Sequence, residues 1–142
     1  MKNTFTIAES IIINAPAGKV WEALTDPAMV KQYLFDTEMS ADWRVGGSIR
    51  YRGVWEGKPY EDKGSIIAIM PEKLLKTTYY SPASGLEDKL ENYNTVSYKL
   101  DKSDGKTKLT VIQDNIPTKE SADHSSKNWH MVLEKLKDVV EH

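Results

Sequence analysis

Cysteine is absent from this 142-residue sequence, and its absence excludes disulfide frameworks, thiolate zinc sites, iron–sulfur clusters and cysteine nucleophiles. Long apolar runs are absent as well. The run Ile11–Ile13 is too short for the apolar segment of an export signal, and no stretch approaches the roughly 18 residues of a membrane span. We therefore expect a cytoplasmic protein of one domain, residues 1–142, that makes no contact with a membrane.

An excess of positive charge is also missing, since 19 Lys and Arg residues are balanced by 21 Asp and Glu residues, for a formal net charge of −2. Proteins that bind nucleic acids carry a basic surface that neutralises phosphates, so we expect no nucleic-acid partner. The patterns GxxxxGK[ST], GxGxxG, GxSxG and HExxH, typical of nucleotide, dinucleotide, hydrolase and zinc-protease sites, do not occur. On these grounds we expect neither a cofactor nor a metal.

The residues that are present predict one strand, two short helices and then a run of strands. β-Branched and aromatic residues predict a strand over Thr4–Ile13, and Asp26-Pro27 supplies the cap and first turn of the second helix. Between residues 48 and 113 the predicted strands are too closely spaced for crossover helices, so we expect them to pair antiparallel. The segment Ser81–Asn92 interrupts them, and we expect a mobile loop with a helical turn there.

The C-terminal segment has a different periodicity, because its apolar residues recur at intervals of three and four: Trp129, Val132, Leu133, Leu136 and Val140. This spacing predicts a long amphipathic helix that begins near Thr118 or Ser121 and covers the sheet. Together the elements predict an α+β fold in which a curved antiparallel sheet of about six strands wraps around a long C-terminal helix.

Four patterns in this order resemble those of a known family. They are APxxxVWxALTDP at Ala15–Pro27, DxRxGG at Asp42–Gly47, GxIxxIxPxxxL from Gly64, and GWxxxLxxL around Trp129–Leu136, where Asn128 replaces the usual glycine. The chain resembles the family related to the activator of heat-shock protein 90 ATPase, within the START and birch-pollen-allergen superfamily. The resemblance spans essentially the whole chain and implies the helix-grip fold. The glycine pair is expected to allow an unusual backbone angle or close packing.

The functions implied by this resemblance are several, because the superfamily includes ligand carriers, cyclases, hydrolases and chaperone regulators. The leading implication is a non-enzymatic protein that holds a small hydrophobic or aromatic molecule, lipid-like, flavonoid-like or polyketide-like, in a cavity between sheet and C-terminal helix. One alternative is a co-chaperone-like regulator that contacts a heat-shock ATPase in the stress response. Another is a cyclase or hydrolase that uses Glu9 or His130.

Aromatic residues with polar edges are the best candidates for a ligand site, because their rings pack against flat ligands while a hydroxyl or indole N–H fixes the orientation. The candidate ligand-binding residues are Tyr33, Tyr51, Trp55, Tyr79, Tyr98, Trp129 and Leu133. Trp129 and Leu133 are expected to form a helix wall, the strand aromatics a sheet wall, and Tyr33 a lid. Taken singly, each ring is also explained by core packing.

Two acid–base candidates have simpler explanations. Glu9 interrupts the apolar face of the first strand, where an unpaired carboxylate is unstable in a dry core, so a β-bulge or an edge position is expected to bring it to water. His130 and Glu134 are four residues apart, a spacing that favours an ion pair on a solvated helix face over a metal site or proton relay. We therefore expect no catalytic residue.

Overall fold

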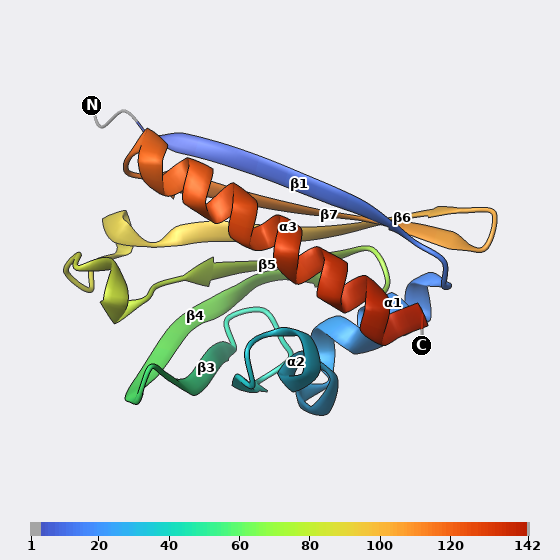
Figure 1. Cartoon of the computed structure of the whole chain (residues 1–142), viewed down its shortest axis with the longest axis horizontal. Helices are drawn as coiled ribbons and strands as arrows, with labels where there is room; N and C mark the ends of the chain where they lie inside the picture. The colour runs from blue at the N-terminus through green and yellow to red at the C-terminus, as the bar shows by residue number, and fades with distance from the viewer. Residues whose placement is uncertain (1–3, 142) are drawn as a thin grey trace.

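The computed structural model describes residues 4–141, except for the side chains of Trp55 and Ala83. It has the predicted α+β architecture, with one antiparallel sheet in the order β1-β7-β6-β5-β4-β3-β2 and a long helix, α3, lying across it (Figure 1). The strands are β1 (Phe5–Ile13), β2 (Glu38–Ala41), β3 (Ser48–Trp55), β4 (Lys58–Met70), β5 (Leu74–Tyr79), β6 (Asn94–Ser103) and β7 (Lys106–Ile116). The helices are α1 (Ala17–Thr25), α2 (Pro27–Tyr33) and α3 (Lys119–Glu141), with single 3-10 turns η1 (Pro82–Ser84) and η2 (Leu90–Asn92).

The sheet has seven strands rather than the predicted six or so. The strand missing from the prediction is β2, which is only four residues long and contributes one fully buried apolar side chain, Met39. Alternation cannot be recognised over so few residues. The two short helices are confirmed, and α2 begins where predicted because the Asp26 carboxylate accepts a hydrogen bond from the Ala28 N–H at 2.9 Å.

The glycine pair of the DxRxGG pattern has both of the expected roles. Gly46 has a φ of +85°, a left-handed conformation that favours glycine. A Cβ atom on Gly47 would lie 2.0 Å from the carbonyl oxygen of Asp42, so only a residue without a side chain fits there. The turn that leads into β3 therefore depends on both residues.

Strand β1 is at one edge of the sheet and pairs with β7, so the first and last strands of the chain lie side by side (Figure 1). Glu9 faces Val111 across this pair and is half-buried. The predicted edge position is confirmed, but a bulge at Glu9 is not: the register shift lies between Phe5 and Ile7. Glu9 thus stays in phase with the buried residues of its strand and reaches water at the open edge.

Helix α3 closes the core, as its apolar stripe predicted. It begins after Thr118, whose hydroxyl accepts a hydrogen bond from the Ser121 N–H at 3.0 Å, and runs for 23 residues. Val132, Leu133 and Leu136 are each no more than 2% exposed and pack against the sheet face that α3 covers, called the inner face below. Within residues 4–141, no helix is both long and apolar enough to cross a membrane.

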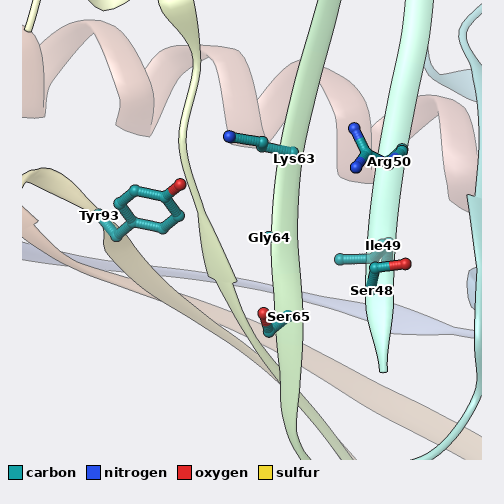
Figure 2. A pocket seen from close by; sticks show the side chains of 7 residues that line it. All are labelled: Ser48, Ile49, Arg50, Lys63, Gly64, Ser65 and Tyr93. Atoms are coloured by element: carbon teal, nitrogen blue, oxygen red, sulfur yellow. The ribbon is translucent and has the colours of Figure 1, made fainter. Parts of the chain in front are cut away.

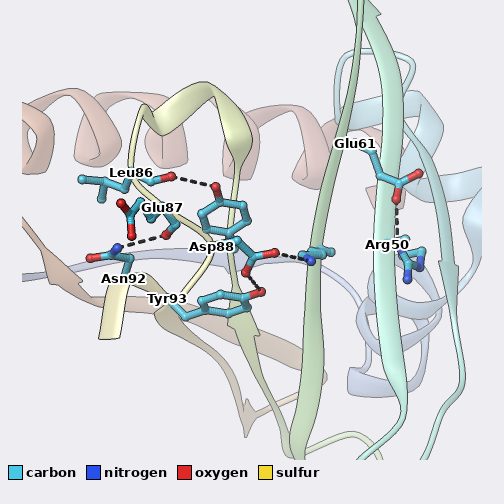
Figure 3. Close-up of polar contacts among 9 residues, drawn as sticks. Arg50, Glu61, Leu86, Glu87, Asp88, Asn92 and Tyr93 are labelled. Carbon is cyan, nitrogen blue, oxygen red and sulfur yellow. Dashed lines mark hydrogen bonds and ion pairs between the residues drawn. The ribbon is translucent and has the colours of Figure 1, made fainter. Parts of the chain in front are cut away.

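The loop after β5 contains two short 3-10 turns where one helical turn was predicted, and it is held by several polar contacts (Figure 3). Tyr80 donates a hydrogen bond to the Leu86 carbonyl at 2.7 Å, and its ring stacks on Tyr93 with centroids 5.2 Å apart. Tyr93 in turn donates to Asp88 at 2.5 Å. Mobility of this loop stays a prediction.

Candidate functional site

Strand alternation brings most of the candidate aromatic residues together on the inner face. Tyr51, Tyr79 and Tyr98 lie on β3, β5 and β6, in phase with buried residues of those strands. Trp129 reaches them from α3, because its ring meets that of Tyr98 edge-on with centroids 5.9 Å apart. These four side chains, with Tyr33 from α2, are called the aromatic cluster below.

The rings of Tyr51 and Tyr79 lean toward each other across β4. Their strands are two positions apart in the sheet, a separation of roughly 9.6 Å, yet the ring centroids are only 6.3 Å apart. Gly64, on the intervening strand, lets β4 approach the backbone of β5 closely. A Cβ atom there would lie 1.8 Å from the Thr78 carbonyl oxygen. The glycine of the third sequence pattern is therefore required for the close packing of β4 against β5, the strand that carries Tyr79.

Asp62 lies beneath the two leaning rings. It pairs with Tyr51 across β3 and β4, and its Oδ2 accepts a hydrogen bond from the Tyr79 hydroxyl at 2.5 Å. Its Oδ1 is shielded from solvent and has no hydrogen-bond partner within the described part of the chain. The cluster thus has one carboxylate at its base: one of its oxygens accepts a hydrogen bond, and the other has no partner among the described residues.

The tyrosine hydroxyls of the cluster stay protonated well beyond neutral pH. Burial raises the pKa of Tyr51 to about 12, with the charge of Asp62 adding to the increase and a hydrogen bond with Tyr98 opposing it. Burial is also the main reason why the pKa values of Tyr79 and Tyr98 lie well above the ordinary range, and the Asp62 charge again contributes at Tyr79. The site therefore presents neutral hydroxyl groups and one carboxylate.

Tyr33 was predicted to form a lid and Leu133 part of the helix wall, but both side chains are buried more deeply than these roles suggest. Tyr33 is 5% exposed, and its hydroxyl donates to the Ala23 carbonyl at 2.8 Å, which ties α2 to α1. Burial, aided by Tyr51, raises its pKa far above the ordinary range. Leu133 is 2% exposed within the core. Direct contact of either residue with a ligand stays a prediction, and the side chain of Trp55 lies outside the described part of the structure.

Trp129 is held in place by a polar contact as well as by packing. Its indole N–H donates to Gln113 Oε1 at 2.8 Å, across the space between α3 and β7. The side chain is half-buried, whereas Val132, Leu133 and Leu136 on the same helix are buried. Gln113 was not among the predicted residues, although its phase on β7, two residues beyond Val111, marks it as inward-facing.

Asp62 was also missed by sequence reasoning. It is the middle residue of Glu61-Asp62-Lys63, a charged run of the kind that usually lies in water. The available signal was its two-residue phase with the apolar Ile66, which places Asp62 inward while Glu61 and Lys63 point outward.

Two of the hollows on the described surface, of about 230 and 240 Å³, lie away from the aromatic cluster. Figure 2 shows the first, where Arg50 and Lys63 lie above a pair of serines on β3 and β4. Both cations already have partners, since Arg50 Nη1 is 2.6 Å from Glu61 Oε1 and Lys63 Nζ is 2.5 Å from Asp88 Oδ2 (Figure 3). The second is formed by the start of α1 and the β6–β7 turn. The predicted cavity between sheet and helix is neither of these.

The remaining acid–base candidates are on the surface. His130 Nε2 is 3.9 Å from Glu134 Oε1, with the two side chains 68% and 58% exposed, so the two residues form the predicted pair on the solvated face of the helix. In the part of the chain that the structure describes, no three His, Asp or Glu side chains come together as metal ligands.

Comparison with known proteins identifies relatives over nearly the whole chain. The family model described as "Activator of Hsp90 ATPase homolog 1-like protein" matches residues 14–141. ChR145 from Cytophaga hutchinsonii, a solution structure, is 38% identical with a TM-score of 0.85, over 99% of this chain and 97% of that one. No curated protein matches the chain.

More distant structures share the fold. CalU16 from Micromonospora echinospora is 21% identical with a TM-score of 0.75, over 95% of this chain and 75% of that one. DynU16, from the dynemicin biosynthetic locus, is 22% identical with a TM-score of 0.77, over 96% of this chain and 47% of that one. The match of the family model, supported by the similarity to ChR145, shows that the chain belongs to the family of Activator of Hsp90 ATPase homolog 1-like proteins.

Proposed function

We propose that this protein binds a small hydrophobic or aromatic molecule between the inner face of its sheet and α3, and releases it unchanged. The observation that carries the proposal is the incomplete burial of the aromatic cluster. Four of its five members keep some accessible surface: Tyr51, Tyr79 and Tyr98 on the covered face of the sheet, and Trp129 on the helix that covers it. In contrast, the side chains of Val132 and Leu136, on the same helix as Trp129, are buried.

The chemistry of the cluster favours flat, largely apolar ligands. Aromatic rings offer broad contact surfaces, and their neutral hydroxyl groups fix orientation through a few hydrogen bonds. Lipid-like, flavonoid-like and polyketide-like molecules share these properties. The one hydroxyl–carboxylate contact that the described cluster shows joins Asp62 to Tyr79, and because burial raises the pKa of Tyr79 well above its ordinary range, this hydroxyl is a poor nucleophile, which favours a binding role.

The test is a chemical-shift titration of the ¹⁵N-labelled protein with one fatty acid, one flavonoid and one aromatic polyketide. We expect at least one probe to shift the amides of Tyr51, Tyr79 and Tyr98 and the indole N–H of Trp129. Trp129→Ala should weaken binding of that probe at least about tenfold, since a well-packed aromatic contact contributes more than 1.4 kcal/mol. Lys127→Ala, on the exposed side of α3, should leave the affinity unchanged.

Two results would contradict the proposal and favour the other functions. Shifts that appear only when a purified heat-shock ATPase is added, on residues outside the cluster, would indicate a co-chaperone. Conversion of a bound probe by the native protein, lost in Glu9→Gln or His130→Ala, would indicate an enzyme.

A further inference from the structure

The base of the aromatic cluster contains a carboxylate oxygen that the protein does not satisfy. Asp62 faces inward on β4, opposite Tyr51 and in phase with the buried Ile66. Its Oδ2 accepts the Tyr79 hydroxyl, but Oδ1 has no solvent contact and no partner within residues 4–141. A buried acceptor without a donor destabilises the folded state, and the penalty is greater for a charged group.

The nearby cations do not supply the missing partner. Arg50, Arg52 and Lys63 are on strands β3 and β4, but they alternate with the inward residues and lie on the outer face. There the two arginines hold Glu61, and Lys63 holds Asp88. The carboxylate of Asp62 is therefore separated by the sheet itself from the charges that could neutralise it.

We propose that Asp62 Oδ1 is the recognition point for the ligand, and that it selects aromatic molecules carrying a phenolic or enolic hydroxyl. This inference rests on the proposed function, because it assumes that a ligand enters the cluster. The ligand hydroxyl donates to Oδ1 as Tyr79 donates to Oδ2, while the ligand rings pack against Tyr51 and Tyr98.

A hydroxyl suits this acceptor better than an ammonium group does. A hydroxyl has a single hydrogen to donate, which matches the single unpaired oxygen of Asp62. An ammonium group has three N–H donors, of which Oδ1 can accept one, so the other two would have to displace the hydrogen bonds of the tyrosine hydroxyls to find acceptors. A ligand without any donor would leave Oδ1 buried and unpaired.

The experiment compares three probes of one size: 2-naphthol, 2-methoxynaphthalene and protonated 2-naphthylmethylamine, each titrated into the labelled protein at pH 7. We expect 2-naphthol to bind about 10-fold to 100-fold more tightly than the methyl ether, the range of a hydrogen bond to a charged acceptor. In Asp62→Asn, the hydroxyl of Tyr79 holds the amide oxygen and turns the NH₂ group toward the ligand. The preference for 2-naphthol over the ether should then disappear or reverse.

Two further variants keep the result interpretable. Asp88→Asn makes the same chemical change on the outer face, where the carboxylate binds Lys63 and Tyr93, and should leave the preference unchanged. Tyr79→Phe keeps the Asp62 carboxylate and should retain the preference, so it tests the inference even where Asp62→Asn folds poorly by circular dichroism.

The outcomes separate the two proposals. Equal binding of 2-naphthol and its ether to the native protein, or tighter binding of the amine, would overturn the role of Asp62 and leave the binding function standing. Failure of every probe, and of the fatty acid, flavonoid and polyketide, to shift the cluster would overturn both.

Discussion

Replacing Gly64 by alanine tests whether β4 and β5 pack so closely that residue 64 can carry no side chain. The added Cβ would lie 1.8 Å from the Thr78 carbonyl oxygen and 2.7 Å from its carbon. An ordinary carbon–oxygen contact is roughly 3.3 Å or longer. The two strands would therefore have to separate by more than an ångström, because both colliding atoms belong to rigid backbone.

The magnitude follows from the atoms that must move. Overpacking a well-filled site costs roughly 1 to 3 kcal/mol, and a collision with backbone belongs at or above the top of that range. The shift would also disturb the hydrogen bond from the Ser65 N–H to Thr78 Oγ1, which is 2.9 Å long. We expect Gly64→Ala to lower the free energy of unfolding by about 3 to 5 kcal/mol.

Urea denaturation followed by tryptophan fluorescence and circular dichroism measures this loss. Gly18→Ala is the matched control, because a Cβ there meets nothing closer than 3.8 Å and the residue lies in α1. Alanine is the better helix former, so the control should gain up to about 1 kcal/mol. A loss below about 1 kcal/mol in Gly64→Ala, with an unchanged m-value, would refute the close approach of the two strands.

Three further predictions concern the core and the cluster. Trp129→Ala should cost about 1 to 3 kcal/mol in urea melts, less than the roughly 2 to 5 kcal/mol of Leu136→Ala, because the tryptophan is only half-buried; equal losses would place the ring in the core. Thr107→Val should cost about 1 to 3 kcal/mol, since its buried hydroxyl donates to the Ala15 carbonyl at 2.8 Å; a neutral result would mean that water replaces the bond. Because burial raises the folded-state pKa of Tyr51 to about 12, the free energy of unfolding should be at its full value below pH 10 and fall as the pH rises toward 12. Tyr51→Phe should make this fall smaller. Identical pH profiles of the two proteins would contradict the role assigned to burial.

Local signals were sufficient for most of the fold. Asp26-Pro27 predicted the start of α2. The dipeptide Asp104-Gly105 is a strong local signal for a hairpin, and both residues have the positive φ angles that the β6–β7 turn requires. Strand β2 was not predicted, because it forms through its pairing with β3 and not through a strand-like composition of its own.

The site was only partly predictable, because its polar members depend on register. The aromatic residues could be selected by type, and Tyr51, Tyr79, Tyr98 and Trp129 do meet. Asp62 could not be selected by residue type, because a charged run usually lies in water; its phase with Ile66 indicates the inner face but not its place beside Tyr51. It enters the cluster only through the pairing of β3 with β4, a long-range property that composition does not reveal.

The pairing of the first strand with the last one constrains how the protein is made. Ile13 pairs with Thr107, so β1 leaves the ribosome long before the residues that complete its hydrogen bonds. At a synthesis rate of roughly 5 to 20 residues per second, β1 waits roughly 5 to 20 seconds for β7. During that interval its isoleucine-rich segment is an unpaired strand of the kind that aggregates, so nascent chains stalled before β7 are the form of this protein most in need of a chaperone.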